Sequence, residues 1–364
     1  MPAPKRPVPE IKKKGPPGQD LKLALSRKRG ALFGLAVGDA LGTTHEFRKL
    51  LAPPFPTLAA GPHTEMTGAG PFNLKPGQVT DDTHMACCIG EVLRSLRRYD
   101  PLEAAKGYAR WRKVTFDIGN QTAEAIDAFT VGNFFTPLPV GRSHWLKSAR
   151  KSAGNGSLMR TAPLGVFFAS NRDARVRASL EDSALTHYDP RCQLSCVALN
   201  GSIAAPIGSA KPPRPAEIAR AALVDVSLAA AHLAKAQSED VLYIQDAVEA
   251  LQEDLEFAAA ADPELYGPEL HLFNTAGYVR VAFRLAYWEL FHAPSFEAAL
   301  IDVVNRGGDS DTNAAIAGAL LGAVHGEAGI PERWRTPVLE VFSITRAGPF
   351  WDLYHPRLLL DGLA

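Results

Sequence analysis

The sequence contains few cysteines, and their spacing excludes the common cysteine-based sites. Four cysteines occur in 364 residues. Cys87 and Cys88 are adjacent, whereas Cys192 and Cys196 are four residues apart in an apolar run. Neither pair has zinc-ribbon spacing, and there is no CxxC partner elsewhere. We therefore expect reduced, buried thiols in a cytoplasmic protein; a disulfide is the alternative interpretation.

Long hydrophobic runs and an excess of charge are also lacking. No stretch reaches the ~18–20 apolar residues that are needed to span a bilayer, and the first twenty residues contain no apolar run of signal-peptide length. We therefore expect neither a membrane span nor a secretion signal. The 39 Lys and Arg residues equal the 39 Asp and Glu residues in number. No overall field therefore favours nucleic acid or a membrane surface as a partner.

The neutral balance conceals a basic N-terminal segment. Residues 1–29 carry nine Lys or Arg residues and two Asp or Glu residues, so the remainder is net negative. Residues 2–17 contain six prolines, which remove backbone donors and oppose packing into a core. We predict a flexible, basic, Pro-rich arm over residues 1–24 and a single domain over residues 25–364. The arm is either a disordered terminus or a segment that docks on an acidic partner.

Strand-type alternation is scarce, and helical periodicity begins at Leu21, which predicts an all-α fold. Predicted helices at 27–42 and 311–325 carry glycines at four-residue spacing along one face. Each glycine lowers helix stability by about 1 kcal/mol relative to alanine. Close packing against a neighbouring helix would explain why glycine is nevertheless used, so we expect these two helices to pack closely together. Other helices are expected at 81–98, 102–113, 119–130, 157–169, 191–205, 215–236, 240–260, 276–292, 296–304 and 332–343, with long connections over 137–156 and 205–215.

Four short segments concentrate the side chains that could carry chemistry. They are Gly38–Gly42 followed by Glu46, Thr80–Thr83, Asn155–Arg160 with a downstream His187, and Gly307–Asn313. Adjacent aspartates repel each other unless a cation neutralises them or both face water. Carboxylate and hydroxyl oxygens suit Mg²⁺ or Mn²⁺ better than zinc. The two aspartate-rich segments therefore favour a site for a hard divalent cation.

The aspartate-rich segments also have simpler interpretations. Thr80 and Asp81 could only cap the helix that begins there, and Asp309–Asn313 could be a solvated loop. A calcium-binding loop is excluded, because its sixth and twelfth positions are Ala314 and Leu320 rather than Gly and Glu. A phosphatase-type aspartate loop would need an α/β sheet, which the helical periodicity does not supply.

Taken together and in this order, the segments resemble the ADP-ribosylglycohydrolase family, and within it the dinitrogenase-reductase-activating glycohydrolases. The strings that carry the resemblance are GLAVGDALGTTHEF, GQVTDDTHMA, FDIGNQT, GNGSLMRTAPLG, LTHYDP, GYVRVAFRLAYW and VNRGGDSDTNAAIAGALLGA. They cover nearly all of the predicted domain. The resemblance implies a compact, orthogonal multi-helix fold with a central site for two Mg²⁺ ions, for which Mn²⁺ is a substitute.

The resemblance also implies roles for individual positions. Those that match the metal ligands of the family are Thr80, Asp81, Asp82, Asp309, Asp311 and Thr312. Those that match its ADP-ribose contacts are Gly154, Asn155, Gly156, Ser157, Met159, His187 and Tyr278. Without this pattern, His187 would be interpreted as a satisfied histidine near a helix start. The loop at 154–157 would likewise be only the start of a helix.

The predicted catalytic residues are Glu46, Asp117 and Asp311, and the resemblance implies Glu46 and Asp117 because they match acidic positions of the family. Since hydrolysis at an anomeric carbon requires proton transfer, we hypothesise that Asp117 acts on the scissile bond or clamps the leaving arginine. Glu46 would position a metal ion or its water. The alternative is that Asp117 only caps the helix expected at 119–130.

The predicted activity is Mg²⁺-dependent hydrolysis of the N-glycosidic bond between ADP-ribose and a protein side chain. Arginine is favoured because the FDIGN string resembles the arginine-type branch, whereas serine- or base-linked ADP-ribose are the alternatives. Two other classes of protein function remain as alternatives. One is an immunity or regulatory protein that blocks an ADP-ribosyltransferase by occlusion through the basic arm. The other is a phosphohydrolase that uses Asp309 and Asp311.

Overall fold

The computed structural model describes residues 17–131, 133–341 and 351–363 of the chain. Within these residues, strands are limited to two antiparallel ribbons. Strand β1 (Arg48–Lys49) pairs with β4 (Gly307–Gly308), and β2 (Thr130–Val131) pairs with β3 (Phe134–Phe135). The predicted all-α fold is confirmed.

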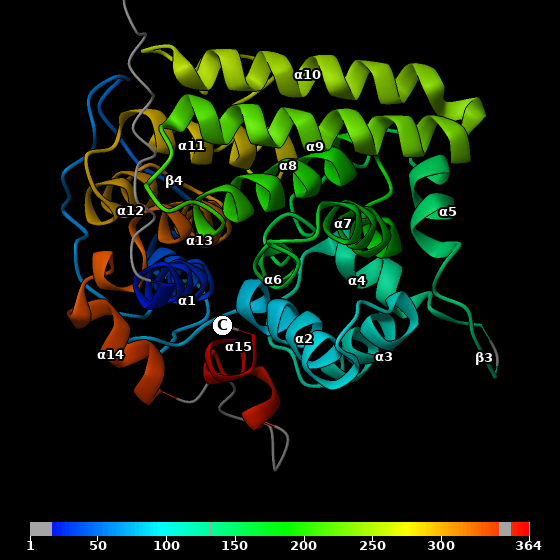
Figure 1. Cartoon of the computed structure of the whole chain (residues 1–364), viewed down its shortest axis with the longest axis horizontal. Coiled ribbons are helices and arrows are strands. Elements are labelled where there is room, and N and C mark those ends of the chain that lie inside the picture. The colour runs from blue at the N-terminus through cyan, green and yellow to red at the C-terminus, as the bar shows by residue number, and fades with distance from the viewer. Residues whose placement is uncertain (1–16, 132, 342–350, 364) are drawn as a thin grey trace, which may run out of the picture.

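The helices run through the whole described part of the chain (Figure 1). The α-helices are α1 (Pro17–Gly42), α2 (Asp81–Leu96), α3 (Pro101–Trp111), α4 (Asn120–Asp127), α5 (Val140–Lys147), α6 (Ala162–Phe167), α7 (Arg172–Thr186), α8 (Pro190–Ile207), α9 (Pro215–Ala236), α10 (Val241–Ala259), α11 (Val279–His292), α12 (Phe296–Asn305), α13 (Ser310–His325), α14 (Glu332–Glu340) and α15 (Arg357–Gly362). Short 3₁₀ helices are η1 (Thr43–His45), η2 (Ser238–Asp240), η3 (Glu327–Gly329) and η4 (Trp351–Tyr354).

The predicted close packing of the two glycine-bearing helices is confirmed. Figure 1 shows α1 beside α13. A β-carbon added at Gly34 would lie 2.0 Å from the carbonyl oxygen of Gly318, and one added at Gly38 would lie 2.0 Å from that of Ala314. Backbone therefore packs on backbone along this seam. The seam brings Gly42 at the end of α1 close to Ser310 and Asp311 at the start of α13, although the two segments are far apart in the sequence.

Replacing Gly38 with alanine should destabilise the protein. The new methyl group would overlap the Ala314 carbonyl oxygen, which is backbone and cannot rotate away. Overpacking of this kind typically costs about 1–3 kcal/mol, which exceeds the gain in helix propensity. Urea denaturation measures the change. Gly208→Ala is the matched control, because the nearest atom to its added β-carbon would be 3.6 Å away. Equal stabilities of the two variants would contradict the close packing.

Helix α8 is buried along almost its whole length and packs against α7, α9 and α13. Helices α9 and α10 lie along the upper edge of Figure 1, and α2, α3 and α15 lie along the lower edge. Buried apolar residues from α1 to α15 form one hydrophobic cluster. Among the described helices, none combines the length and apolarity required to cross a bilayer.

Three helices differ from the sequence predictions. Helix α5 lies within the segment 137–156, which was predicted to be a connection. Helices α7 and α15 were not predicted. In α7 the buried face includes Arg175 and Asp182, which are paired with charged groups on other segments. Charged residues at buried positions interrupt the apolar periodicity that predicts a helix.

The predicted N-terminal arm overlaps helix α1. This helix begins at Pro17, so residues 17–24 belong to its first turns. The arm prediction for residues 1–16 lies outside the described residues, and so do residues 342 and 343 of the last predicted helix. The single-domain organisation stays a prediction.

Candidate functional site

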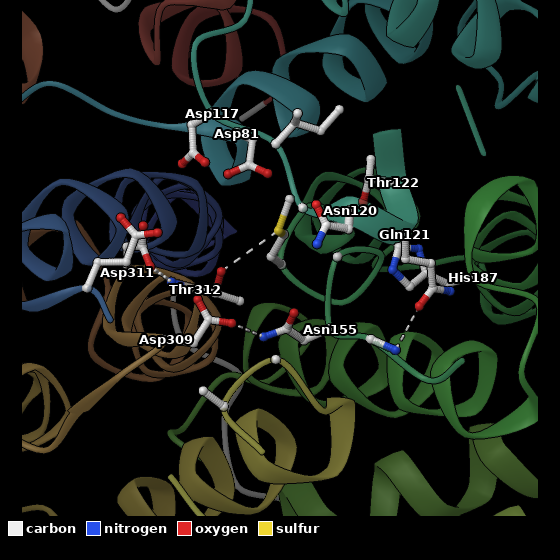
Figure 2. Close-up of a pocket in the computed structure, with 18 of the residues that line it drawn as sticks. Asp81, Asp117, Asn120, Gln121, Thr122, Asn155, His187, Asp309, Asp311 and Thr312 are labelled. Carbon is white, nitrogen blue, oxygen red and sulfur yellow. Dashed lines mark hydrogen bonds between the residues drawn. The ribbon is translucent and has the colours of Figure 1, made fainter. Parts of the chain in front are cut away.

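A cavity of about 350 Å³ lies where the first residues of α2, α4 and α13 approach the loop before α6. Figure 2 shows Asp81 and Asp117 on one side of this cavity, with Asp309, Asp311 and Thr312 on another side. Among the described residues that line it, carboxylates are frequent and neither Lys nor Arg occurs. The cavity is therefore strongly acidic.

Three of the carboxylates form a close group. One oxygen atom from each of Glu46, Asp117 and Asp311 lies within 4.8 Å of the others. Burial, followed by the nearby carboxylates, raises the pKa of Asp117 to about 10. Burial raises the pKa of Glu46 to about 8, and that of Asp81 to about 7. Carboxylates this crowded resist simultaneous ionisation unless a positive charge joins them.

The donor atoms of the cluster fit a hard divalent cation. Asp82 Oδ1 and Glu46 Oε2 are buried and have no hydrogen-bond partner within the described part of the chain. A buried polar atom without a partner costs free energy, which a cation would relieve. Carboxylate and hydroxyl oxygens are the ligands that Mg²⁺ and Mn²⁺ prefer. The chemistry of the residues therefore fits the expected metal.

The predicted metal ligands fall into two groups. Asp81, Asp309, Asp311 and Thr312 line the cavity. Thr80 and Asp82 do not line it: both are buried, and Thr80 Oγ1 lies 3.2 Å from Asp82 Oδ2. The structure therefore brings all six close together but exposes four of them to the cavity.

Asp39 organises the start of α2, a role that the sequence analysis missed. Its buried carboxylate accepts hydrogen bonds from Thr80 N at 3.0 Å, Thr80 Oγ1 at 2.9 Å, Thr83 N at 3.1 Å and Thr83 Oγ1 at 2.5 Å. Thr80 is the N-cap residue but makes no side-chain cap bond. The interpretation in which Thr80 or Asp81 caps the helix is therefore wrong, because the cap comes from α1. The sequence did contain a signal for this role: Asp39 is a carboxylate between two glycines of a helix that was predicted to be closely packed.

Asp117 and Asp81 both line the cavity. The N-cap of α4 is Gly119, without any side-chain cap bond. The alternative in which Asp117 only caps this helix is therefore wrong.

The segment from Gly154 to Met159 contributes Gly154, Asn155, Gly156 and Met159 to the cavity lining. Gly154 N donates to Gln121 Oε1 at 3.1 Å, and Asn155 Nδ2 donates to Asp309 Oδ2 at 2.7 Å. Helix α6 begins only at Ala162, so this segment is a series of turns and not the start of a helix. Among the described residues, the backbone N–H groups of Gly156 and Ser157 have no acceptor. Consecutive backbone N–H groups in such turns can bind an anionic oxygen.

The remaining predicted substrate contacts have different positions. Met159 and His187 line the cavity together with Gly154, Asn155 and Gly156. Ser157 is fully buried and its hydroxyl accepts from Ser183 Oγ at 2.9 Å. Tyr278 lies in an adjoining hollow that shares Gly154 and Gly277 with the cavity, and its hydroxyl accepts from Arg191 Nη1 at 2.8 Å.

Comparison with known proteins finds a family model that matches most of the chain. The ADP-ribosylglycohydrolase family model matches residues 20–357. The chain belongs to the ADP-ribosylglycohydrolase family. The resemblance and the prediction of a glycohydrolase are thereby confirmed.

Two relatives and one solved structure illustrate the match. An ADP-ribosylarginine hydrolase, Tri1, of Serratia proteamaculans is 29% identical over 319 residues, which cover 85% of this chain and 75% of the relative. An ADP-ribosyl-[dinitrogen reductase] glycohydrolase of Rhodospirillum rubrum is 28% identical over 312 residues, covering 85% and 88%. A solved ADP-ribosylglycohydrolase-related protein complex has a TM-score of 0.60 and 26% identity, covering 93% and 98%.

Proposed function

We propose that the protein is a Mg²⁺-dependent hydrolase that cleaves the N-glycosidic bond between ADP-ribose and an arginine side chain of a modified protein. The observation that carries the proposal is the shared cavity: the Glu46, Asp117 and Asp311 carboxylates lie at one part of it, and Gly154, Asn155 and Gly156 lie at another. A phosphate-binding segment beside a carboxylate group suits a substrate with a pyrophosphate and a scissile sugar bond. The names of the Serratia and Rhodospirillum relatives support the same reaction.

Mg²⁺ would be held by oxygen atoms at the starts of α2 and α13. The residues are Thr80, Asp81, Asp82, Asp309, Asp311 and Thr312. When bound, two such ions supply charge neutralisation, orientation of ribose hydroxyls and activation of a water molecule.

The chain's own carboxylates supply the proton transfers. The bond between the ribose anomeric carbon and the guanidine nitrogen breaks, the nitrogen takes up a proton, and a water hydroxyl adds to the carbon. Asp117 donates the proton to the leaving nitrogen, and Glu46 orients or accepts the proton of the attacking water. Proton transfer of this kind contributes about 10²–10⁴-fold to the rate.

Charge complementarity favours arginine over serine as the attachment point. An arginine-linked substrate carries a guanidinium group into the site, whereas a serine-linked substrate has a neutral oxygen there. The described cavity lining has no positive side chain, and it has five carboxylates, from Glu46, Asp81, Asp117, Asp309 and Asp311. Bound Mg²⁺ would neutralise much of the charge of Asp81, Asp309 and Asp311, and Glu46 and Asp117 are not among its predicted ligands. Opposite charges attract more strongly in a buried site than in water.

The purified protein should release ADP-ribose faster from an arginine-linked substrate than from serine- or base-linked ones. The three substrates are incubated in parallel with Mg²⁺, and released ADP-ribose is quantified. Release from the serine- or base-linked substrate alone would overturn the arginine assignment while leaving a glycohydrolase. Occlusion of an ADP-ribosyltransferase by the arm and a cytoplasmic location stay predictions.

A further inference from the structure

A buried chain of hydrogen bonds connects Asp182 to His187. Arg160 Nε donates to Asp182 Oδ2 at 2.9 Å, and Arg160 Nη2 donates to Thr186 Oγ1 at 3.0 Å. Thr186 Oγ1 lies 2.8 Å from His187 Nδ1. Each of these side chains is at most 1% exposed. Of the four side chains, only His187 lines the cavity. Bulk water therefore does not reach the hydrogen bonds between them, and their donors and acceptors must match one another.

The direction of each hydrogen bond follows from the chemistry of the groups. A guanidinium group has only donors, so Thr186 Oγ1 accepts from Arg160. Thr186 Oγ1 has no other hydrogen-bond partner among the described residues. Its single hydroxyl proton therefore goes to His187 Nδ1, which is the acceptor. A neutral imidazole with an accepting Nδ1 carries its proton on Nε2. Burial, and after it the charge of Arg160, holds the pKa of His187 well below its usual value, so the ring is neutral.

The protonated nitrogen faces the backbone segment that lines the cavity. A β-carbon added at Gly154 would lie 3.2 Å from His187 Nε2, and one added at Gly156 would lie 3.1 Å from it. Figure 2 shows His187 near Gln121, at the other end of the cavity from Asp311. Within the described residues, no acceptor takes the backbone N–H of Gly156 or Ser157. Gly156 and His187 both line the cavity, so the Gly156 N–H and the His187 Nε2–H are two donors at its edge for which the described residues supply no acceptor.

We propose that Arg160 and Thr186 are positioning residues that fix His187 as the Nε2–H tautomer, which makes its Nε2–H a permanent donor to a phosphate oxygen. The ligand is identified as ADP-ribose, and in this respect the inference rests on the proposed function. A phosphate oxygen only accepts hydrogen bonds. The other tautomer would turn a nitrogen lone pair toward that oxygen, and the interaction would be repulsive.

Nitrogen NMR of the histidine-labelled protein tests the tautomer directly. The spectrum of wild type at neutral pH should show a protonated Nε2 and an unprotonated Nδ1 for His187, which is assigned by the signal that is lost in His187→Gln. A protonated Nδ1 would overturn the proposal. This measurement does not depend on enzymatic activity. If the tautomer is as expected but wild type binds no ADP-ribose, the proposed function fails and the tautomer assignment stands.

Two substitutions of Thr186 test the positioning role. Thr186→Val removes the hydroxyl and should raise the Kd for ADP-ribose about 10- to 100-fold, the usual effect of losing a hydrogen bond to a charged group. Thr186→Ser keeps the hydroxyl and should restore both the binding and the nitrogen spectrum. Thr161→Val is the matched control, because Thr161 Oγ1 is a buried hydroxyl that accepts from Asn200 Nδ2 outside the cavity lining.

The comparison separates positioning from a general packing effect. A Kd increase in Thr186→Val that is no larger than in Thr161→Val would overturn the role of Thr186. So would failure of Thr186→Ser to restore binding. If Thr186→Val does not fold, the wild-type spectrum and Thr186→Ser still decide between the two tautomers.

Discussion

Replacing Asp311 with asparagine should reduce turnover by about 10²–10⁴-fold, with helical content close to that of wild type. Asp311 is buried, and one of its oxygens belongs to the close group with Glu46 and Asp117. Asparagine has nearly the same shape but lacks the charge and one acceptor oxygen. In metal-free buffer the variant should be at least as stable as wild type, because one of several crowded carboxylates is removed.

Single-turnover release of ADP-ribose, together with urea denaturation, measures both effects. Asp246→Asn is a control for the substitution itself, since Asp246 is an exposed residue of α10 outside the cavity lining. A wild-type rate for Asp311→Asn would remove Asp311 from the mechanism. If the variant is much less stable than wild type, misfolding would explain its lower rate.

Replacing Asp39 with alanine should reduce both stability and turnover. The substitution removes the acceptor of the backbone N–H groups of Thr80 and Thr83, which are buried at the start of α2. Each buried donor without a partner costs about 1–3 kcal/mol. Asp81 and Asp82 follow directly in the chain, so disorder at this helix start would displace two predicted metal ligands.

Asp100→Ala is the matched control for Asp39→Ala. The Asp100 side chain caps α3 through Leu102 N and Glu103 N, but outside the candidate site. Its loss should cost only about 1 kcal/mol and should leave turnover unchanged. Urea denaturation and steady-state rates are measured for both variants. If Asp39→Ala has the wild-type rate, or if Asp100→Ala loses as much activity, the organising role of Asp39 is wrong.

The sequence predicted the parts of the fold that depend on local patterns. Glycines at four-residue spacing predicted the contact between α1 and α13, because glycine removes the side chains that separate two helices. Helix α7 was missed because Arg175 and Asp182 occupy buried positions. Their partners, Asp225 and Arg160, lie on other segments. Such pairs become visible only in three dimensions.

The candidate site was predictable in composition but not in detail. Paired aspartates in apolar surroundings indicated a hard-cation site, and the family resemblance brought Glu46 and Asp117 into it. The role of Asp39 depends on α1 lying against the start of α2, which no local pattern encodes. For the same reason, the sequence could not separate the cavity-lining Asp81 from the buried Asp82 next to it.

Metal removal tests the central claim most directly. Wild-type protein is incubated with an arginine-linked ADP-ribosylated substrate in Mg²⁺, then with excess EDTA, then with Mg²⁺ restored. The account predicts release of ADP-ribose in the first condition, loss of release in the second and recovery in the third, because the buried carboxylates need a cation to act together. Undiminished release in EDTA would contradict the account.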